Sequence, residues 1–265
     1  MKSIRISPSM VKDYEKCPRL YKFRYIDKLP RQVTPLLFVG TVIHSSLKEL
    51  FLLPQSSDKT KEVLEKILRK IWSNSSERKK VFKTAEEEKF WGIKALSLIE
   101  NFIIHFHPLH MPYRLEEYHE VFVKENIIFY GRIDRIDIDK ENKLHIYDYK
   151  IGSSPKAVED FISKDVQLGM YGVMIKKKFL RDVVEGSYLF LSDGKKLTIP
   201  LTTEYMVSIL SHVEKVAEKL QKEEDFLPRV SNLCPYCDFV ELCPEGREKS
   251  SLANNKEEFT DDLPF

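Results

Sequence analysis

The sequence lacks several features that would place this chain in a familiar functional class. It has no Gly-x-x-x-x-Gly-Lys-Ser/Thr phosphate-binding loop, so we expect no ATP-driven motor in it. It has no internal repeat, and no apolar run approaches the roughly 20 residues that a helix needs to cross a bilayer. The N-terminus has no apolar signal core. We therefore expect a cytoplasmic protein that does not bind a membrane.

What is present is typical of a globular protein with a substantial core. Of the 265 residues, 42% are hydrophobic and 11% are aromatic, which suffices for one large domain. The formal net charge of +2 combines a tail, residues 250–265, of net charge −3 with a remainder of net charge +5. A mildly basic remainder is compatible with nucleic-acid binding, but a lysine-rich surface explains it equally well.

The hydrophobic pattern changes from a helical period to a period of two near residue 115. Helices are predicted near 7–17, 19–26, 36–53, 59–73, 83–106, 155–163, 164–178 and 202–222, the first with Ser7 as its N-cap. Strands are predicted near 117–124, 127–138, 143–150, 183–192 and 195–200. We predict a single domain over residues 1–248, with a helical insertion at 55–114 that contains no catalytic motif. Residues 249–265 are predicted to be a disordered acidic tail.

Residues 127–150 form a predicted β-hairpin whose apolar phase contains charged side chains. Asp134 shares its phase with Ile136, and Asp148 and Lys150 share theirs with Ile146. Burying such charges is costly unless they pair or bind a metal. Two carboxylates on adjacent strands can converge on Mg²⁺ or Mn²⁺, which can activate water and neutralise phosphate charge. A buried Asp–Lys ion pair is the alternative interpretation.

Four motifs resemble those of the PD-(D/E)xK nuclease superfamily. They are Gly40-Thr41-Val42-Ile43-His44, Gly131-Arg132-Ile133-Asp134-Arg135-Ile136-Asp137, Tyr147-Asp148-Tyr149-Lys150-Ile151-Gly152 and Gln167-Leu168-Gly169-Met170-Tyr171. They resemble more closely the nuclease domains of RecB and AddB and the CRISPR-associated RecB-like exonucleases. Asp rather than Glu at position 148 is nearer to the RecB/AddB pattern. The resemblance implies an α/β, restriction-endonuclease-like core with a central mixed sheet flanked by helices.

The same resemblance implies a role for each matching residue. The implied catalytic residues are Asp134, Asp148 and Lys150. The implied metal ligands are His44, Asp134, Asp148 and the backbone carbonyl of Tyr149. The residues expected to line the active site or contact nucleic acid are Gln167, Tyr171, Arg132 and Arg135. Glu120 lies where related enzymes sometimes have an extra acidic residue.

The four cysteines are spaced as one plus three: Cys17, then Cys234, Cys237 and Cys243. Disulfides are not expected in a cytosolic protein. The arrangement and the sequence around it resemble the iron–sulfur site of AddB-type nucleases, which implies that the four thiolates hold a [4Fe–4S] cluster. Zinc is the main alternative, and four free thiols are the simplest. The cluster-binding segment, 234–246, is expected to pair with Cys17.

For two further stretches we adopt an interpretation that assigns them no catalytic or binding role. His105, His107 and His110 straddle a predicted helix end, so we expect surface or capping histidines. Asp261–Phe265 resembles the acidic tail tip of bacterial single-stranded-DNA-binding proteins, but a solubilising tail is the interpretation we favour.

Together these observations predict a metal-dependent DNA nuclease, an exonuclease acting on single-stranded or frayed DNA ends. The pathway would be DNA repair and recombination or CRISPR adaptation, with a helicase or another protein of that pathway as a partner. The main alternative is a catalytically silent module of the same fold that binds DNA or a partner protein. An iron–sulfur redox protein is a third alternative, but no electron-transfer motif is visible.

Overall fold

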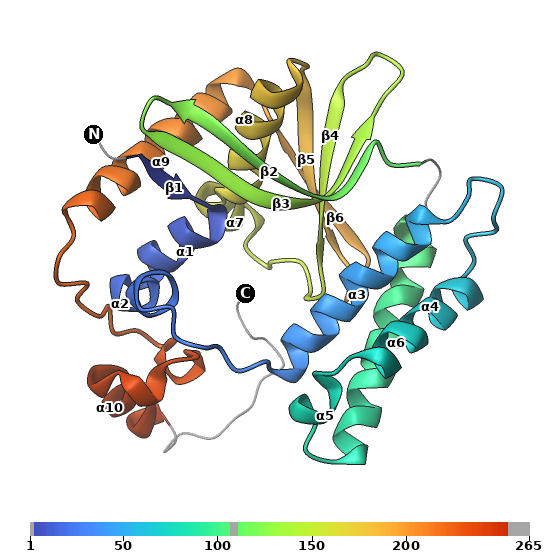
Figure 1. The fold of residues 1–265 in the computed structure, drawn as a ribbon, viewed down its shortest axis with the longest axis horizontal. Helices are drawn as coiled ribbons and strands as arrows, with labels where there is room; N and C mark the ends of the chain where they lie inside the picture. The colour runs from blue at the N-terminus through green and yellow to red at the C-terminus, as the bar shows by residue number, and fades with distance from the viewer. Residues whose placement is uncertain (1–2, 107–110, 254–265) are drawn as a thin grey trace. The chain divides into compact units, whose positions relative to one another are not determined.

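The computed structural model describes residues 3–106 and 111–253 (Figure 1). The chain divides into two compact units, which we describe separately. Unit 1 comprises the described residues of Met1–Gln32, Lys124–Ile128 and Ser211–Phe265, and unit 2 those of Val33–Val123 and Phe129–Leu210. The predictions for His107, His110 and the tail tip Asp261–Phe265 fall outside the described residues.

The sheet of unit 2 is mixed, as predicted. Its strands are β2 (Arg114–Lys124), β3 (Ile127–Ile138), β4 (Leu144–Lys150), β5 (Val183–Phe190) and β6 (Lys195–Pro200). They run in the order β3-β4-β5-β6, and β2 pairs with β3. β3 and β4 are antiparallel, β4 and β5 parallel, and β5 and β6 antiparallel. Arg135 pairs with Tyr147, so one step further along the register brings Asp134 beside Asp148.

Helices of unit 2 cover this sheet and build an apolar core with it. They are α3 (Pro35–Leu52), α4 (Lys61–Asn74), α5 (Arg78–Val81) and α6 (Ala85–Phe106), which lie beside one another in Figure 1. Thr34 and Thr60 cap α3 and α4 by accepting hydrogen bonds from backbone N–H groups of the first turn. One apolar cluster joins α3, α4 and α6 to Tyr149, Leu189 and the neighbouring Leu191. The stretch 55–114 therefore contains the predicted helices, and they pack on the sheet.

One helix of the described residues, α3, is long and apolar enough to cross a membrane by length and composition. Eight of its residues are buried, and they belong to the core cluster shared with α4 and α6 or lie beside it. This is the behaviour of a helix inside a folded core.

The connection from β4 to the parallel strand β5 contains α7 (Val158–Lys164) and α8 (Gln167–Phe179). α8 packs very closely on β5. A Cβ atom at Gly186 would lie 3.0 Å from the Leu168 side chain, so glycine at that position allows the approach. This close packing holds Gln167, the first residue of α8, next to the end of β4.

Unit 1 brings both terminal parts of the chain together. Its N-terminal part contains β1 (Ile4–Ile6), α1 (Pro8–Lys16), α2 (Pro18–Tyr21) and the π-helical turn Lys22–Ile26. Its C-terminal part contains the 3₁₀ turns Cys234–Tyr236 and Val240–Leu242 and helix α10 (Pro244–Ala253), and it also includes the end of α9 (Thr203–Lys222). Ser7 caps α1 as predicted. The tail prediction was wrong for 249–253, because α10 continues through them.

An ion-pair network ties these two parts of unit 1 to each other. Arg24 donates to both carboxylate oxygens of Asp13 at 2.7 Å and also to Asp238 at 2.7 Å. Arg31 donates to the same Asp238 oxygen at 2.8 Å. Because Asp238 lies between Cys237 and the following turn, these charge-assisted bonds hold the cysteine-bearing segment against the N-terminal helices.

Candidate active site

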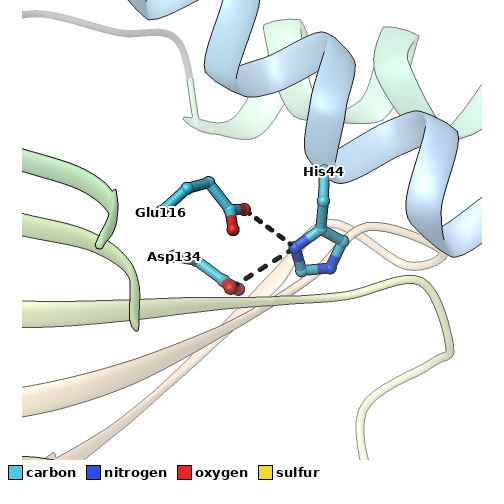
Figure 2. A group of neighbouring side chains, drawn as sticks. All are labelled: His44, Glu116 and Asp134. Carbon is cyan, nitrogen blue, oxygen red and sulfur yellow. Dashed lines mark ion pairs between the residues drawn. The ribbon is translucent and has the colours of Figure 1, made fainter. Parts of the chain in front are cut away.

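Three candidate metal ligands converge from three elements of unit 2. His44 lies near the middle of α3, Glu116 near the start of β2, and Asp134 within β3. Figure 2 shows His44 Nδ1 facing both carboxylates, 3.4 Å from Asp134 Oδ1 and 3.5 Å from Glu116 Oε1. One donor atom from each residue lies within 4.8 Å of the other two. An imidazole nitrogen and two carboxylate oxygens are ligands that divalent cations accept, so the residues present fit a metal ion.

The charge balance of this group also fits a cation. Burial disfavours the charged imidazolium of His44, but the carboxylates of Asp134 and Glu116 outweigh that effect and raise the pKa of His44 to about 10. A proton on His44 thus supplies the positive charge that the two partly enclosed carboxylates require. A divalent cation would supply the same compensation, with neutral His44 as a ligand.

Glu116 is a site residue that the sequence analysis missed. Its backbone has a φ of +48°, which is uncommon for a residue other than glycine. Arg132 donates a hydrogen bond to the Glu116 carbonyl oxygen, which holds this unusual turn in place. The residue considered instead, Glu120, is exposed and accepts a hydrogen bond from the Tyr118 hydroxyl at 2.8 Å. The only sequence signal for Glu116 was an acidic residue near the start of a predicted strand.

Asp148, Lys150 and Gln167 form a closed triangle of contacts. Lys150 Nζ lies 2.6 Å from Asp148 Oδ2, and Gln167 Nε2 donates to Asp148 Oδ1 at 2.6 Å. Lys150 Nζ also donates to Gln167 Oε1 at 3.3 Å. Burial raises the pKa of Asp148, against the opposing effect of the Lys150 ammonium, while nearby carboxylates outweigh burial and raise the pKa of Lys150. Lys150 therefore keeps its positive charge.

Asp134 connects this triangle to the metal centre. Its Oδ2 accepts a hydrogen bond from the Tyr149 backbone N–H at 2.9 Å, while its Oδ1 faces His44. The Tyr149 ring is buried and contacts His44 edge-on, with ring centroids 5.9 Å apart. These contacts place the Tyr149 peptide beside the site, and ligation by its carbonyl stays a prediction.

A pair of tyrosines supports the other wall of the site. The Tyr171 hydroxyl donates to the Arg132 carbonyl oxygen at 2.9 Å, and a Cβ atom at Gly131 would lie only 2.9 Å from the Tyr171 ring. Glycine at 131 therefore leaves the space that the ring occupies. The Lys150 ammonium lies 5.0 Å from the ring centre of Tyr188, a distance at which cation–π attraction acts.

Tyr188 belongs to a buried support that the sequence did not indicate. Its hydroxyl donates to Asp165 Oδ1 at 2.6 Å, and Asp165 Oδ2 accepts the Leu168 N–H at 3.2 Å. Asp165 thus satisfies a backbone donor in the first turn of α8, one residue after Gln167. The support fixes both the start of α8 and the ring beneath Lys150.

The two arginines beside Asp134 occupy different environments. Arg132 is exposed. Arg135 is 6% exposed, and its guanidinium makes a bidentate ion pair with Asp137, at 2.7 and 2.6 Å, and stacks 4.5 Å from the ring centre of Phe51. Its strand places Arg135 under α3 with its guanidinium already paired, so we no longer expect it to contact nucleic acid; the prediction that it lines the active site or contacts nucleic acid stays untested.

The four cysteines line one cavity of unit 1, although Cys17 and the other three lie more than two hundred residues apart in the sequence. None of them forms a disulfide. Cys17 Sγ accepts the Arg229 N–H at 3.3 Å, and Cys234 Sγ accepts the Ser231 N–H at 3.3 Å. The same cavity is lined by Lys16, Arg19 and Arg229. Burial raises the pKa of the Cys237 and Cys243 thiols, a cost that metal binding to the thiolates would offset. Four sulfur ligands around one cavity fit a thiolate-bound metal centre.

The mixed α/β fold and a histidine–carboxylate centre beside an Asp-x-Lys pair define a nuclease-like protein. The family model of the PD-(D/E)XK nuclease superfamily matches residues 5–244. The chain therefore belongs to the PD-(D/E)XK nuclease superfamily. The matched range includes the candidate metal ligands His44, Glu116 and Asp134 and all four cysteines.

A solved structure with a TM-score above 0.5 agrees on the fold. A crystal structure from Eubacterium rectale, of a protein assigned as an exonuclease, aligns with 98% of this chain and 91% of its own, at a TM-score of 0.52 and 13% identity. The crystal structure of SSO0001 aligns with 92% of this chain and 87% of its own, at a TM-score of 0.40 and 17% identity. No curated protein matches the sequence. The predicted restriction-endonuclease-like fold class is confirmed.

Proposed function

We propose that this chain is an Mg²⁺- or Mn²⁺-dependent deoxyribonuclease of the RecB/AddB-like branch. It would hydrolyse phosphodiester bonds as an exonuclease on single-stranded or frayed DNA ends. The observation that carries the proposal is the convergence of His44, Glu116 and Asp134 next to the Asp148–Lys150–Gln167 triangle. The exonuclease assignment of the Eubacterium rectale structure supports the choice of reaction. A role in repair or CRISPR adaptation, with a helicase or similar partner, stays a prediction.

In this proposal the protein residues have separate tasks. His44, Glu116, Asp134 and Asp148 would hold the cation, which when bound polarises the phosphate and increases the acidity of water. Lys150 keeps an ammonium group at the site and stabilises the negative charge that develops on the phosphate oxygens. Gln167 fixes the Asp148 carboxylate and the Lys150 ammonium in one geometry through its two hydrogen bonds.

Digestion of end-labelled DNA with variants at the triangle tests the proposal. We expect Asp148→Asn and Lys150→Ala to reduce the cleavage rate by at least about 100-fold. The first removes an anionic ligand of the proposed cation, and the second removes the ammonium that stabilises negative charge on the phosphate. Matched controls are Asp182→Asn and Lys195→Ala, whose side chains are 75% and 68% exposed. Circular single-stranded DNA should stay intact if the enzyme requires an end.

The outcome of the same assay separates the alternatives. Undiminished cation-dependent cleavage by both triangle variants would refute the assignment. Wild-type protein that binds DNA but does not cleave it with Mg²⁺ or Mn²⁺ would favour the catalytically silent module. Cleavage of circular DNA would replace the exonuclease by an endonuclease.

We further propose that Cys17, Cys234, Cys237 and Cys243 hold a [4Fe–4S] cluster. The four cysteines line one cavity of unit 1, and four thiolates, each binding a different iron, are the complement that a cubane cluster requires. Zinc is the alternative occupant of the same four thiolates. The surrounding Arg19 and Arg229 would balance the negative charge of such a cluster.

Metal analysis after anaerobic purification tests the cluster separately from the nuclease. We expect about four iron and four sulfide per chain in the wild type and a large loss of both in Cys237→Ser, because four thiolates are the complement of such a cluster. Zinc in place of iron and sulfide would overturn the cluster proposal and leave the nuclease proposal untouched.

A further inference from the structure

Exposed aromatic rings form a row on one face of β2. Tyr118 is 45% exposed and Phe122 is 57% exposed. His119, between them, is fully buried, and its ring contacts Phe179 of α8 at a centroid distance of 5.9 Å. Because side chains alternate along a strand, Tyr118 and Phe122 lie on the face that points away from α8.

This row continues onto the neighbouring strand. Tyr130 of β3 is half-buried, and its ring centroid lies 6.3 Å from that of Tyr118. Two residues further along β3 is Arg132, which is exposed and donates a hydrogen bond to the Glu116 carbonyl oxygen. We call Tyr118, Phe122, Tyr130 and Arg132 the aromatic row.

The aromatic row begins at the candidate metal centre. The Glu116 side chain faces His44, while its carbonyl oxygen accepts the Arg132 hydrogen bond. From Glu116 to Phe122 there are six residues, which at about 3.3 Å per residue span roughly 20 Å. A substrate strand leaving the metal centre along β2 would therefore pass several rings within the length of a few nucleotides.

The chemistry of the row suits a single strand of DNA. Aromatic rings stack on the faces of unpaired bases, and such stacking tolerates any base sequence. Arg132 adds a cation that can pair with a backbone phosphate. In a duplex the base faces are already stacked on each other, so the exposed rings have nothing to bind. An exonuclease that acts on single-stranded or frayed ends needs to hold the unpaired strand at its active site.

We propose that the aromatic row is a binding track for single-stranded DNA, which stacks the unpaired bases next to the nucleotide at the metal centre. The proposal rests on the proposed nuclease function. It assigns to β2 and β3 a role in substrate binding that is separate from the metal ligands at their ends.

Equilibrium binding without catalysis tests the track directly. Full-length protein in EDTA is titrated into a fluorescein-labelled oligo-dT of twenty nucleotides, and Kd is measured by anisotropy. We expect Tyr118→Ala and Phe122→Ala each to raise Kd by about 5- to 150-fold, the range for the loss of one base stack. Tyr118→Phe should bind like the wild type, because it keeps the ring and removes the hydroxyl that donates to Glu120.

Two controls show whether the loss is a loss of stacking. Phe90→Ala removes another exposed ring, 61% exposed and located on α6, and should leave Kd unchanged. An abasic oligonucleotide of the same length should bind the wild type more weakly and should bind Tyr118→Ala and Phe122→Ala no worse than the wild type.

Three results would overturn the track. They are an unchanged Kd in both alanine variants, an equal loss in Phe90→Ala, and equal affinity of the wild type for the abasic and the normal oligonucleotide. If Phe122→Ala instead alters the oligomeric mass at unchanged Kd, the face binds a second copy of the chain. If the wild type binds DNA through the track but never cleaves it, the nuclease proposal is refuted and the track is kept. If both alanine variants cleave with an unchanged KM, the track is refuted and the nuclease proposal is kept.

Discussion

The buried ion pair between Arg135 and Asp137 yields a sharp prediction about stability. The Arg135 guanidinium is held by two hydrogen bonds to Asp137 and by the ring of Phe51. Burial disfavours its charge, but Asp137 outweighs burial and raises the pKa of Arg135. Arg135→Met keeps most of the volume and removes the charge, which leaves the 3%-exposed Asp137 carboxylate without its guanidinium.

Breaking a buried pair from one side costs about 3–5 kcal/mol. A protein of this kind has about 5–15 kcal/mol of total stability, so Arg135→Met should lower the urea midpoint clearly. The double variant Arg135→Met/Asp137→Leu should recover most of the loss, because it removes both charges from the core. A coupling energy of at least about 2 kcal/mol between the two sites is expected from the double-mutant cycle.

The matched control is Arg69→Met, whose side chain is 65% exposed and which should change the free energy of unfolding by no more than about 0.5 kcal/mol. DNA binding tests the alternative, in which Arg135 contacts a phosphate of the substrate. If Arg135 contacted a phosphate, the slope of log Kd against log salt concentration would fall by about one in Arg135→Met. That fall, together with an unfolding free energy within about 0.5 kcal/mol of the wild type, would refute the buried-pair reasoning.

Three other predictions concern single side chains around the sheet. Burial and the Lys178 ammonium lower the pKa of His119 to about 4. The contribution of neutral His119 to the free energy of unfolding is therefore complete above the ordinary pKa of about 6.5 and is lost as the pH falls towards 4. Between pH 7 and pH 5 the wild type should lose roughly 2 kcal/mol more than His119→Gln in urea unfolding, and parallel pH profiles of the two proteins would contradict this. Gly131→Ala should lower the cleavage rate severalfold, because the new methyl group would displace the Tyr171 ring that it meets at 2.9 Å, and an unchanged rate would show that the ring moves freely. Glu116→Gln should weaken Mn²⁺ binding in calorimetry by about tenfold or more, because it removes one anionic ligand; equal affinity would exclude Glu116 from the centre.

The proposed catalytic carboxylates and lysine could be predicted from sequence because their signal is local. Charges at Asp134, Asp148 and Lys150 interrupt an apolar phase of period two, and only a strand pair explains that pattern. The structure places all three on the paired strands β3 and β4. Lys150 contacts Asp148, and Asp134 accepts a hydrogen bond from the backbone N–H of Tyr149 between them. The resemblance to known motifs identified His44, whose helical stripe alone is typical of a core residue.

Other parts of the site depended on long-range packing. Glu116, which has a positive φ, faces His44 at the start of β2, whereas Glu120 lies four residues, about 13 Å, further along the strand. Arg135 looks like a phosphate-binding residue in sequence, yet the packing of α3 on β3 buries it. Neither outcome follows from local periodicity, since both depend on which helix covers which face of the sheet.

The sequence by itself determined the strand and helix types, the Ser7 cap and the chemical identity of the candidate ligands, because these follow from short-range sterics and hydrogen bonding. Only the tertiary structure decided that Asp165 and Tyr188 support Lys150 and that four cysteines separated by more than two hundred residues line one cavity. Contacts between distant residues arise from the burial of apolar surface, which acts on the whole chain and is not encoded at any single position.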